Sequence, residues 1–494
     1  MKKIFFIAAI ISIFNIQLST LKAQEPDARF KTLKYEWTMN ADGTSDYHYR
    51  HEVQILRNRA LVAYADKGET FVVFNPDLEE LTVNEVYTIQ KDGTRVDMPQ
   101  NAFVYQLPSQ CTDCGRFNHL RELAMVHTGM ELGCTIVVDY TIHRHYNYLH
   151  ESIPLWRECP VDRLEVVVNY NHNDMEMKYT IDGVQNLPEN SVKKDELDNG
   201  LHYTFENLQQ APKEPYMPAD YVPVLRIHNG IPEFTPAFDN AKFSGAQDAM
   251  SRIAGRGSKR DKVNAIRDFV VDNIHLNNID PAHLGYTHAT AEEVWQTGCG
   301  TATDKAVLLA ALLNDEGFEA RVLGDEMDEV GVVFDTLEYR LSARSKAPMY
   351  LYGEAKDEMV QSSIKESREA KMDTLQDGFY RLKLDPVAGA PAISAKRLAL
   401  YRTTPLQSTA CDLKSDISYT LPEGLKMVAP AQSRKLDFDG VGSVEITIKQ
   451  SGKKVRVVRN MKLEKGEIAL ADYSAYRQLI ALWQSVDGVL LQQK

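Results

Sequence analysis

The chain has 494 residues, 44% of them hydrophobic and 25% charged, and its formal net charge is −13. Since domains commonly hold about 100–200 residues, this length predicts roughly three domains, each large enough to bury a core. The acidic balance argues against nucleic acid or an anionic lipid surface as the partner.

The first residues have the pattern of a secretory signal peptide. Lys2 and Lys3 precede an apolar run from Ile4 to Ile16, and Ala23 supplies a small-residue end. The run is short for a membrane span, and no later run is apolar enough to cross a bilayer. No cysteine for lipid attachment stands near the cleavage region. We therefore expect no transmembrane segment and a periplasmic or secreted protein. Cleavage would remove residues 1–24, which contain three lysines and no acidic residue, so the net charge of the mature chain would be −16.

The region from Tyr35 to about Ile227 alternates polar and apolar residues with period two, interrupted by turn signals such as Asp92-Gly93. This pattern predicts an antiparallel β-sandwich. Aromatic residues are frequent in it: Tyr47, Tyr49, Tyr140, Tyr146, Tyr148 and Trp156. Half-buried strand faces are the usual place for such side chains, and a carbohydrate-binding platform is the alternative.

Six cysteines in an oxidising compartment permit up to three disulfides. Cys111 and Cys114 form a close C-x-x-C pair, which we interpret as a structural disulfide or as loop cysteines, with a metal or redox role as the alternatives. His143 and His145 share one strand face, but no further ligand stands at a fixed spacing. The chain lacks a P-loop, a dinucleotide fingerprint, an H-E-x-x-H motif and an EF-hand loop, so we expect no metal and no cofactor.

A Pro-rich segment at 211–230 marks a domain boundary, and we expect it to pack along a domain surface. After it the apolar period changes to that of helices, predicted at 246–253 and 259–274. The segment 290–322 then predicts a short helix, a tight turn, a long apolar helix and a strand. Thr290 and Glu293 form a capping box, Thr303 or Asp304 opens the long helix, and Gly317 ends it.

This segment resembles the transglutaminase-like superfamily, in which a papain-type nucleophile stands in a pattern close to G-D-C-K-D-K-A-x-L-L. Residues 300–306 match the pattern without gaps, which places Ala302 at the nucleophile position. A thiolate there would be stabilised by the positive end of the helix. Asp304 and Lys305 are retained from the pattern, and we expect capping and surface charge from them. Trp295 and Asp304 are candidate cleft-binding residues.

The resemblance also implies positions for a histidine and an acid. The histidine motif falls on Phe334-Asp335-Thr336 and the acid on Tyr352, with Asp385 as an alternative acid. The last histidine in the chain is His288, so no general base follows the helix. All three triad positions, Ala302, Thr336 and Tyr352, therefore hold residues unable to perform the family's chemistry. A relocated site would have to combine Cys299 with His283 or His288.

Beyond the long helix we expect strands at 319–323, 331–341 and 348–352, and a charged helical insertion or disordered loop at 353–378. Alternation returns from Asp412 to Leu463, and an amphipathic helix is predicted at 473–491. The order of segments is similar to exported transglutaminase-like proteins with flanking domains of unknown function.

The sequence thus predicts a multidomain α+β protein. Residues 1–24 are the signal peptide, 25–230 the N-terminal β-sandwich, 231–400 the transglutaminase-like (papain-type) domain, and 401–494 a small C-terminal β-domain with a terminal helix. The favoured function is a non-catalytic binding or structural module of the cell envelope, with an envelope protein or a glycan as the partner. The alternatives are a cysteine peptidase or transglutaminase with the relocated site, and a carbohydrate-binding envelope protein.

Overall fold

The chain forms two compact units in which strands predominate and helices are few. The first consists of residues up to 211 together with 222–352, and the second of residues 212–221 together with 353–494. The computed structural model describes residues 26–66, 71–111, 113–170, 177–197, 199–229, 243, 245–253, 258–323, 329–334, 337–346, 350–351, 360–384, 398–429, 431–485 and 488–493.

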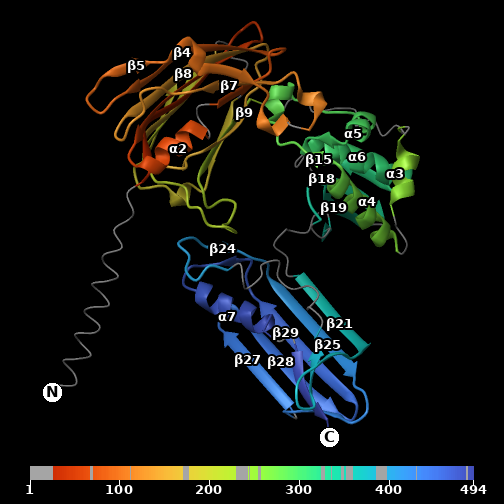
Figure 1. The fold of residues 1–494 in the computed structure, drawn as a ribbon. Coiled ribbons are helices and arrows are strands. Elements are labelled where there is room, and N and C mark those ends of the chain that lie inside the picture. The colour runs from red at the N-terminus through yellow and green to blue at the C-terminus, as the bar shows by residue number, and fades with distance from the viewer. Residues whose placement is uncertain are drawn as a thin grey trace, which may run out of the picture. The chain divides into compact units, whose positions relative to one another are not determined.

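The N-terminal part of the first unit is built on an eight-stranded sheet in the order β12-β13-β10-β1-β2-β8-β4-β5. Its strands are β1 (Ala28–Met39), β2 (Ser45–Ile55), β4 (Glu79–Ile89), β5 (Arg95–Asp97), β8 (Thr135–Arg144), β10 (Val161–Tyr170), β12 (Val192–Leu197) and β13 (Gly200–Leu208). Figure 1 shows β4 and β8 of this sheet side by side. Two three-stranded sheets accompany it, formed by β3 (Phe71–Phe74), β7 (Arg121–Met125) and β6 (Phe103–Gln106), and by β11 (Lys178–Asp182), β14 (Val224–His228) and β9 (His150–Pro154). The helix α2 (Asn58–Asp66) and the short 3-10 turns η1 (Gln100–Ala102), η2 (Ser109–Cys111), η3 (Gly115–Phe117) and η4 (Val184–Asn186) complete this part.

The large sheet is not purely antiparallel, which corrects the sequence prediction. β1 pairs with β10 in parallel, with Leu33 opposite Leu164. A parallel pair needs a long crossover connection, and the many residues between these strands supply one. The alternation of polar and apolar residues along a strand does not reveal the direction of its partner strand. The predicted turn at Asp92-Gly93 is present: it joins the antiparallel strands β4 and β5, and Gly93 has φ +90°.

Several of the aromatic residues of this region form core. Tyr49 stacks on Tyr140 at a centroid distance of 5.0 Å, and Tyr49, Tyr140 and Trp156 are all buried. Tyr148 is exposed, and its ring meets that of Tyr286 edge-on. The buried rings are therefore part of the packing of this region, and they are not available as a carbohydrate platform.

The second part of the first unit contains the segment that the sequence singles out. Its elements are α3 (Ala246–Arg252), α4 (Lys259–Asn273), β15 (His275–Leu276), η5 (Pro281–Leu284), α5 (Ala291–Thr297), β16 (Cys299–Gly300), α6 (Ala302–Asp315) and a four-stranded sheet of β17 (Glu319–Val322), β18 (Glu329–Phe334), β19 (Leu337–Ser342) and β20 (Tyr350–Leu351). The predicted strand at 331–341 spans parts of two antiparallel strands, β18 and β19. Residues 304–313 of α6 are all buried, so this helix is the centre of the local core.

The caps of α5 and α6 follow from the sequence. Thr290 and Glu293 form the predicted capping box, and Gly298 ends α5 in the left-handed conformation. α6 begins at Ala302, earlier than predicted, because Thr301 is the N-cap and Asp304 completes a second capping box. Gly317, at φ +84°, follows the helix end as expected.

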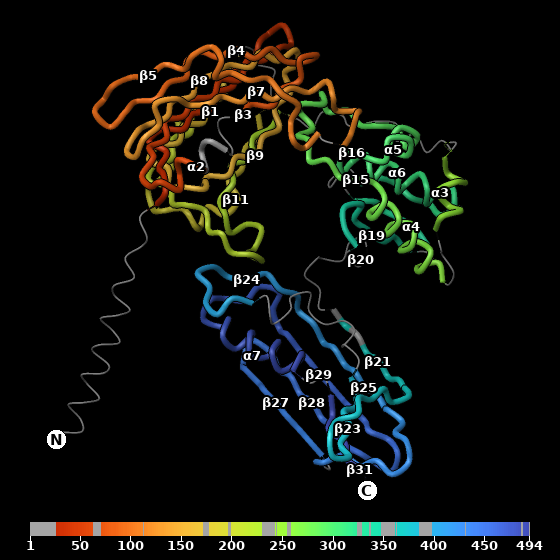
Figure 2. Tube along the Cα trace, in the orientation of Figure 1, coloured from red at the N-terminus to blue at the C-terminus, as the bar shows by residue number. Residues whose placement is uncertain are grey.

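The second unit holds a five-stranded sheet in the order β21-β25-β29-β28-β27, with α7 lying across it (Figure 1). Its elements are β21 (Val360–Glu369), β22 (Lys371–Thr374), β23 (Phe379–Lys383), β24 (Leu406–Gln407), β25 (Cys411–Thr420), β26 (Leu425–Met427), β27 (Ala431–Phe438), β28 (Gly442–Ser451), β29 (Lys454–Leu463), β30 (Glu467–Ile468), α7 (Tyr473–Trp483) and β31 (Gly488–Gln493). The sheet of β22, β23, β31 and β26 lies in the same unit, and Figure 2 shows β31 beside β23.

Two predictions fail in this unit. The segment 360–374, expected to be a helical insertion or a loop, forms β21 and β22, and β21 pairs in parallel with β25. Its polar composition suits a strand at the edge of a sheet, which hid its β character. The terminal helix ends at Trp483, and β31 follows it. The buried side chains Val489 and Leu491 are two residues apart, as strand period requires.

Residues 212–221 of the Pro-rich segment pack within this second unit, whereas β14, at its end, belongs to the first unit. The Glu214 carboxylate accepts hydrogen bonds from the backbone N–H groups of Thr403 and Thr404, at 2.8 and 3.0 Å. Arg402 donates to the carbonyl oxygen of Pro215 at 2.7 Å. The segment therefore packs against a domain surface, as expected.

Within the described ranges, no helix has the length and apolar character that a membrane crossing demands.

Trp483 is the largest fully buried side chain of α7. Trp483→Ala is expected to destabilise the second unit by about 3–5 kcal/mol, since truncation leaves a cavity. Tyr401→Ala, at an exposed position of the same unit, is expected to change stability by about 0.5 kcal/mol or less. Urea denaturation of the full chain followed by far-UV circular dichroism measures both. Equal effects of the two variants would contradict the assigned packing of α7.

Candidate functional site

The start of α6 is the position at which the resemblance places a nucleophile. Ala302 is the first residue of the helix and is half-buried. β16, which precedes it, pairs in parallel with β15. The chain thus passes from a short strand through Thr301 into the helix, and the side chain of Ala302 is a methyl group that can neither attack a carbonyl nor be ionised.

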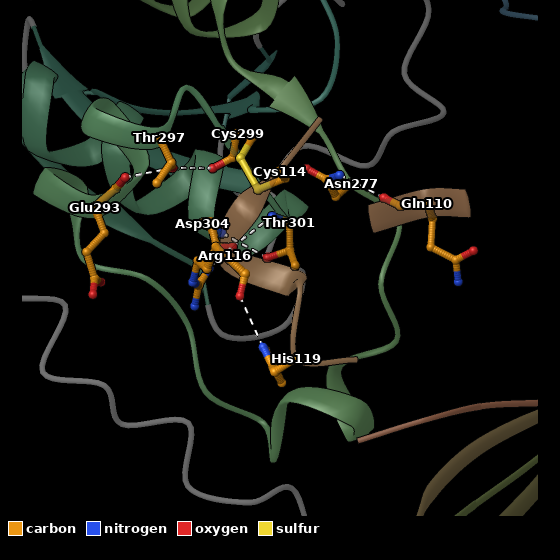
Figure 3. Close-up of a disulfide and its surroundings, with 10 residues drawn as sticks. All are labelled: Gln110, Cys114, Arg116, His119, Asn277, Glu293, Thr297, Cys299, Thr301 and Asp304. Atoms are coloured by element: carbon orange, nitrogen blue, oxygen red, sulfur yellow. Dashed lines mark hydrogen bonds and ion pairs between the residues drawn. A yellow bond between two sulfur atoms is a disulfide. The ribbon is translucent and has the colours of Figure 1, made fainter. Parts of the chain in front are cut away.

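The Asp304 carboxylate is buried beside this position and is bound from three directions. It accepts hydrogen bonds from the backbone N–H of Ala289 at 2.6 Å and from that of Thr301 at 2.7 Å. The third donor is Arg116, whose Nη1 lies 2.7 Å from Oδ2 (Figure 3). Gly300 is required here, because a Cβ at this position would lie 2.7 Å from that of Asp304. Asp304 thus holds the local structure together, and its carboxylate does not serve as an open ligand site.

Arg116 belongs to η3, in the N-terminal part of the unit, so its ion pair joins that part to the start of α6. Its side chain is 22% exposed, whereas that of Asp304 is fully buried. Close by, the Asn277 amide donates to the carbonyl oxygen of Gln110 at 2.8 Å (Figure 3). The segment around η2 and η3 is therefore fixed against the candidate site by polar contacts on two sides.

A disulfide joins the same two regions. Cys114 is bonded to Cys299, which lies in β16 immediately before α6 (Figure 3). The predicted Cys111–Cys114 pair is wrong, since Cys111 remains a buried thiol. Residues so distant in sequence meet only because the N-terminal part packs on the turn before α6. The disulfide, the Arg116 ion pair and the Asn277 hydrogen bond together form the η3–α6 junction.

The relocated catalytic site would need a thiolate at Cys299, and the disulfide occupies that sulfur. The two candidate bases have other contacts. His283 Nδ1 lies 3.2 Å from the Glu79 carboxylate, and His288 Nδ1 lies 2.9 Å from the carbonyl oxygen of Ala289. In this structure Cys299 is therefore a structural cross-link and not a nucleophile.

Two further residues of the segment have structural contacts: Trp295 is partly buried against the core, and Lys305 lies within it. The Trp295 ring packs near Phe269 at a centroid distance of 6.1 Å, and Arg252 lies over it. Lys305 is buried, which corrects the expected surface charge. Its ammonium donates to the carbonyl oxygen of Ile274 at 2.6 Å, at the negative end of α4. Burial lowers the pKa of Lys305. Thr336, Tyr352 and Asp385 lie outside the described residues.

A buried polar network, not predicted from the sequence, is centred on Glu79 at the start of β4. Its carboxylate accepts from the Asn75 backbone N–H at 2.8 Å and from the Tyr146 hydroxyl at 3.1 Å. Arg144 Nε lies 3.4 Å from Oε1 of Glu79, and Nδ1 of His283, in η5, lies 3.2 Å from Oε2. Strand alternation marks these positions only as inward-facing, and it carries no signal that they meet.

The electrostatics of this network favour the ionised form of Glu79. Burial by itself would raise the pKa, but the hydrogen bond and charge of His283, followed by the charge of Arg144, hold the pKa of Glu79 below its ordinary value. Burial also raises the pKa of the nearby Glu151 to about 7. The carboxyl groups of Glu79 and Glu151 both lie beside Arg144, and their pKa values are shifted in opposite directions. Glu79 is the closer of the two to Arg144, at 3.4 Å against 3.7 Å.

An open pocket of about 360 Å³ lies beside the η3–α6 junction. Its lining residues come from three loops: Asn75, Asp77, Leu78, Arg116, Phe117, His119, Leu284, Gly285 and Thr287. This volume suits a small ligand or a single side chain.

The described residues contain no group of three or more His, Cys, Asp or Glu side chains arranged to hold a metal ion. His143 and His145 pair with different carboxylates, Asp46 at 2.8 Å and Glu80 at 3.4 Å, on an exposed strand face.

Comparison with known proteins finds three family models along the chain. Residues 41–213 match a domain of unknown function (DUF3857), residues 247–345 the transglutaminase-like superfamily, and residues 384–490 a second domain of unknown function (DUF3858). The middle match contains α4 to β19, and with them Asn277, Cys299 and Asp304 of the η3–α6 junction.

Among solved structures, one from Parabacteroides distasonis ATCC 8503, described as that of "a putative protease", is 25% identical with a TM-score of 0.71. The match covers 94% of this chain and 99% of that chain. An M1 zinc metallopeptidase from Deinococcus radiodurans shares 9% identity over 60% of this chain and 72% of that chain, and its TM-score of 0.19 is too low to carry an argument. No curated protein sequence matches this chain.

Removing the partner of a buried charge tests the junction. Arg116→Ala is expected to destabilise the first unit by about 3–5 kcal/mol, because it leaves the Asp304 carboxylate buried without its cation. Arg163→Ala removes a surface ion pair with Glu165 and is expected to cost about 1 kcal/mol or less. Urea denaturation compares them. Adding Asp304→Asn to Arg116→Ala should recover part of the loss, and no recovery would argue against an unpaired charge as the cause.

The lowered pKa of Glu79 predicts a pH dependence. The stability that its ionised form contributes is present above its unfolded pKa, near 4.5, and is lost as the pH falls through the lower folded value. The difference in melting temperature between the wild type and Glu79→Gln should therefore be large at neutral pH and shrink below pH 4.5. Thermal unfolding of both proteins over a pH series measures this difference. A difference independent of pH would show that Glu79 acts through packing alone.

Proposed function

We propose that this chain, which carries a transglutaminase-like core between two domains of unknown function, is a non-catalytic member of that group and acts as an exported binding or structural module of the cell envelope. The observation that carries the proposal is Ala302 at the first position of α6, where the nucleophile would stand. Sequence order supports it, since no histidine follows His288.

Papain-type chemistry needs a thiolate that attacks an amide carbon, an imidazole that takes and returns the proton, and a group that orients the imidazole. Losing the nucleophile ends covalent acyl transfer. The backbone at the start of α6 is also engaged internally. The Thr301 N–H donates to the Asp304 carboxylate, and the Asp304 N–H donates to the Thr301 hydroxyl. These two groups are therefore not free to stabilise an anion.

Export is part of the proposal. It is supported by the signal-peptide pattern of residues 1–24 and by the Cys114–Cys299 disulfide, a bond that persists in oxidising compartments such as the periplasm. The chemistry that remains at the site is recognition. An open pocket beside a rigid junction, with Arg116 and His119 among its lining residues, suits the binding of an envelope protein or glycan.

A peptidase is the competing function, and the similarity to the structure described as "a putative protease" favours it. It would require a nucleophile other than residue 302, and Cys299 with His283 or His288 is the arrangement that the sequence offers. That arrangement becomes available only after the Cys114–Cys299 bond is broken. Assays with and without a reductant therefore separate the two functions.

The purified mature chain is expected to show no release of fluorescent peptides from labelled casein and no transfer of a fluorescent amine to casein, with or without dithiothreitol. Cys299→Ala is the matched control. Ala302→Cys should react with iodoacetamide yet gain neither activity, because no histidine follows the helix. Reductant-dependent turnover that Cys299→Ala abolishes would overturn the proposal in favour of a peptidase or transglutaminase. Turnover gained by Ala302→Cys would show that a base survives in the cleft.

A further inference from the structure

We propose that Cys111, Cys114 and Cys299 form a thiol–disulfide exchange site in which Cys111 displaces Cys299 from Cys114. The proposal uses the C-x-x-C motif, which the proposed function leaves without a role. It does not depend on whether the protein is an enzyme, because it concerns the bonding of three sulfur atoms and is tested by chemical labelling.

The three cysteines lie in one apolar cluster. Its other members are Phe117, Leu120, Ile279 and Leu284, and Cys111, Cys114 and Cys299 are exposed by 0%, 2% and 1%. A third sulfur is thus held in the same small core as the disulfide. In such a position it can act as the resolving thiol of the pair, whereas a thiol elsewhere in the fold would need a large opening to reach it.

The local backbone permits a bond between Cys111 and Cys114. The Cys114 N–H donates to the carbonyl oxygen of Cys111 at 3.2 Å, which closes a tight turn. In such a turn the Cα atoms of residues i and i+3 lie within about 7 Å, and disulfides span Cα separations of about 4.4–6.8 Å. The observed bond to Cys299 and the alternative bond to Cys111 therefore both use the sulfur of Cys114.

The exchange balances without any other reactant. The Cys111 thiolate attacks Sγ of Cys114, a Cys111–Cys114 bond forms, and the bond to Cys299 breaks. Cys299 leaves as a thiolate and takes up the proton that Cys111 lost, so nothing is oxidised or reduced overall. Burial, followed by the negative charge of Glu122, raises the pKa of Cys111, so that the attacking form is scarce and the exchange is slow at neutral pH.

The two bonding states differ in what they tie together. The Cys114–Cys299 bond connects residues 185 positions apart and fixes η3 to the turn before α6. The Cys111–Cys114 bond would close only a short loop. The η3–α6 junction would then depend on the Arg116–Asp304 ion pair and on the Asn277–Gln110 hydrogen bond. The exchange also places a thiol at Cys299, beside the start of α6.

Trypsin separates the three cysteines conveniently. Cleavage after Arg95 and Arg116 gives the peptide 96–116 with Cys111 and Cys114, and cleavage after Arg267 and Lys305 gives the peptide 268–305 with Cys299. The oxidised full chain is incubated under native conditions with N-ethylmaleimide and without reductant, then digested and analysed by mass spectrometry. The reagent traps the exchanged state by alkylating Cys299.

In the wild type, an internal disulfide in peptide 96–116 and an alkylated Cys299 are expected to accumulate together. Cys111→Ser should slow alkylation of Cys299 at least about tenfold, and Cys111→Ala serves as a second variant if the first unfolds, as thermal melting reports. Cys134→Ser, at another buried thiol of the first unit, should behave as the wild type. The proposal is overturned if Cys111 is alkylated while the Cys114–Cys299 bond persists, if neither changes on a timescale of days, or if Cys299 is alkylated equally in all variants.

Discussion

The buried Asp304 carboxylate is the interaction on which the candidate site depends. It completes the cap of α6, accepts a hydrogen bond from the segment before α5, and pairs with Arg116 from the N-terminal part of the same unit. A carboxylate fully removed from water is stable only when its oxygens are satisfied and its charge is paired. The Asp304 carboxylate therefore fixes the first turn of α6, the backbone before it and the position of η3.

This arrangement gives α6 a structural role that does not depend on the residue at position 302. Residues 304–313 are buried on every side, so α6 is needed as core whatever residue stands at position 302. Lys305 adds a second structural constraint, because its ammonium satisfies the carbonyl oxygen at the end of α4. The residues retained from the family pattern, Asp304 and Lys305, are the ones that the fold itself uses.

The cysteines connect this core to the question of activity. In the proposed exchange, Cys299 is a cross-link while it is bonded to Cys114 and a thiol once Cys111 has taken its place. The C-x-x-C motif supplies Cys111, the third sulfur that the exchange needs. The buried Glu79 network adds a separate polar contact between the two parts of the first unit, through His283. The N-terminal part and the transglutaminase-like part of the first unit thus share covalent and ionic links, and the site lies where they meet.

The sequence by itself determined the elements whose signals are local: the alternating strands, the capping box at Thr290 and the glycine that ends α6 at Gly317. Those signals depend on period and on neighbours a few residues away. The tertiary structure alone decided the parallel pairing of β1 with β10, the strand character of β21, the Cys114–Cys299 bond and the burial of Asp304 against Arg116. Each of these depends on contacts between residues remote in sequence, whose energies arise only when the chain has folded, so no local pattern records them.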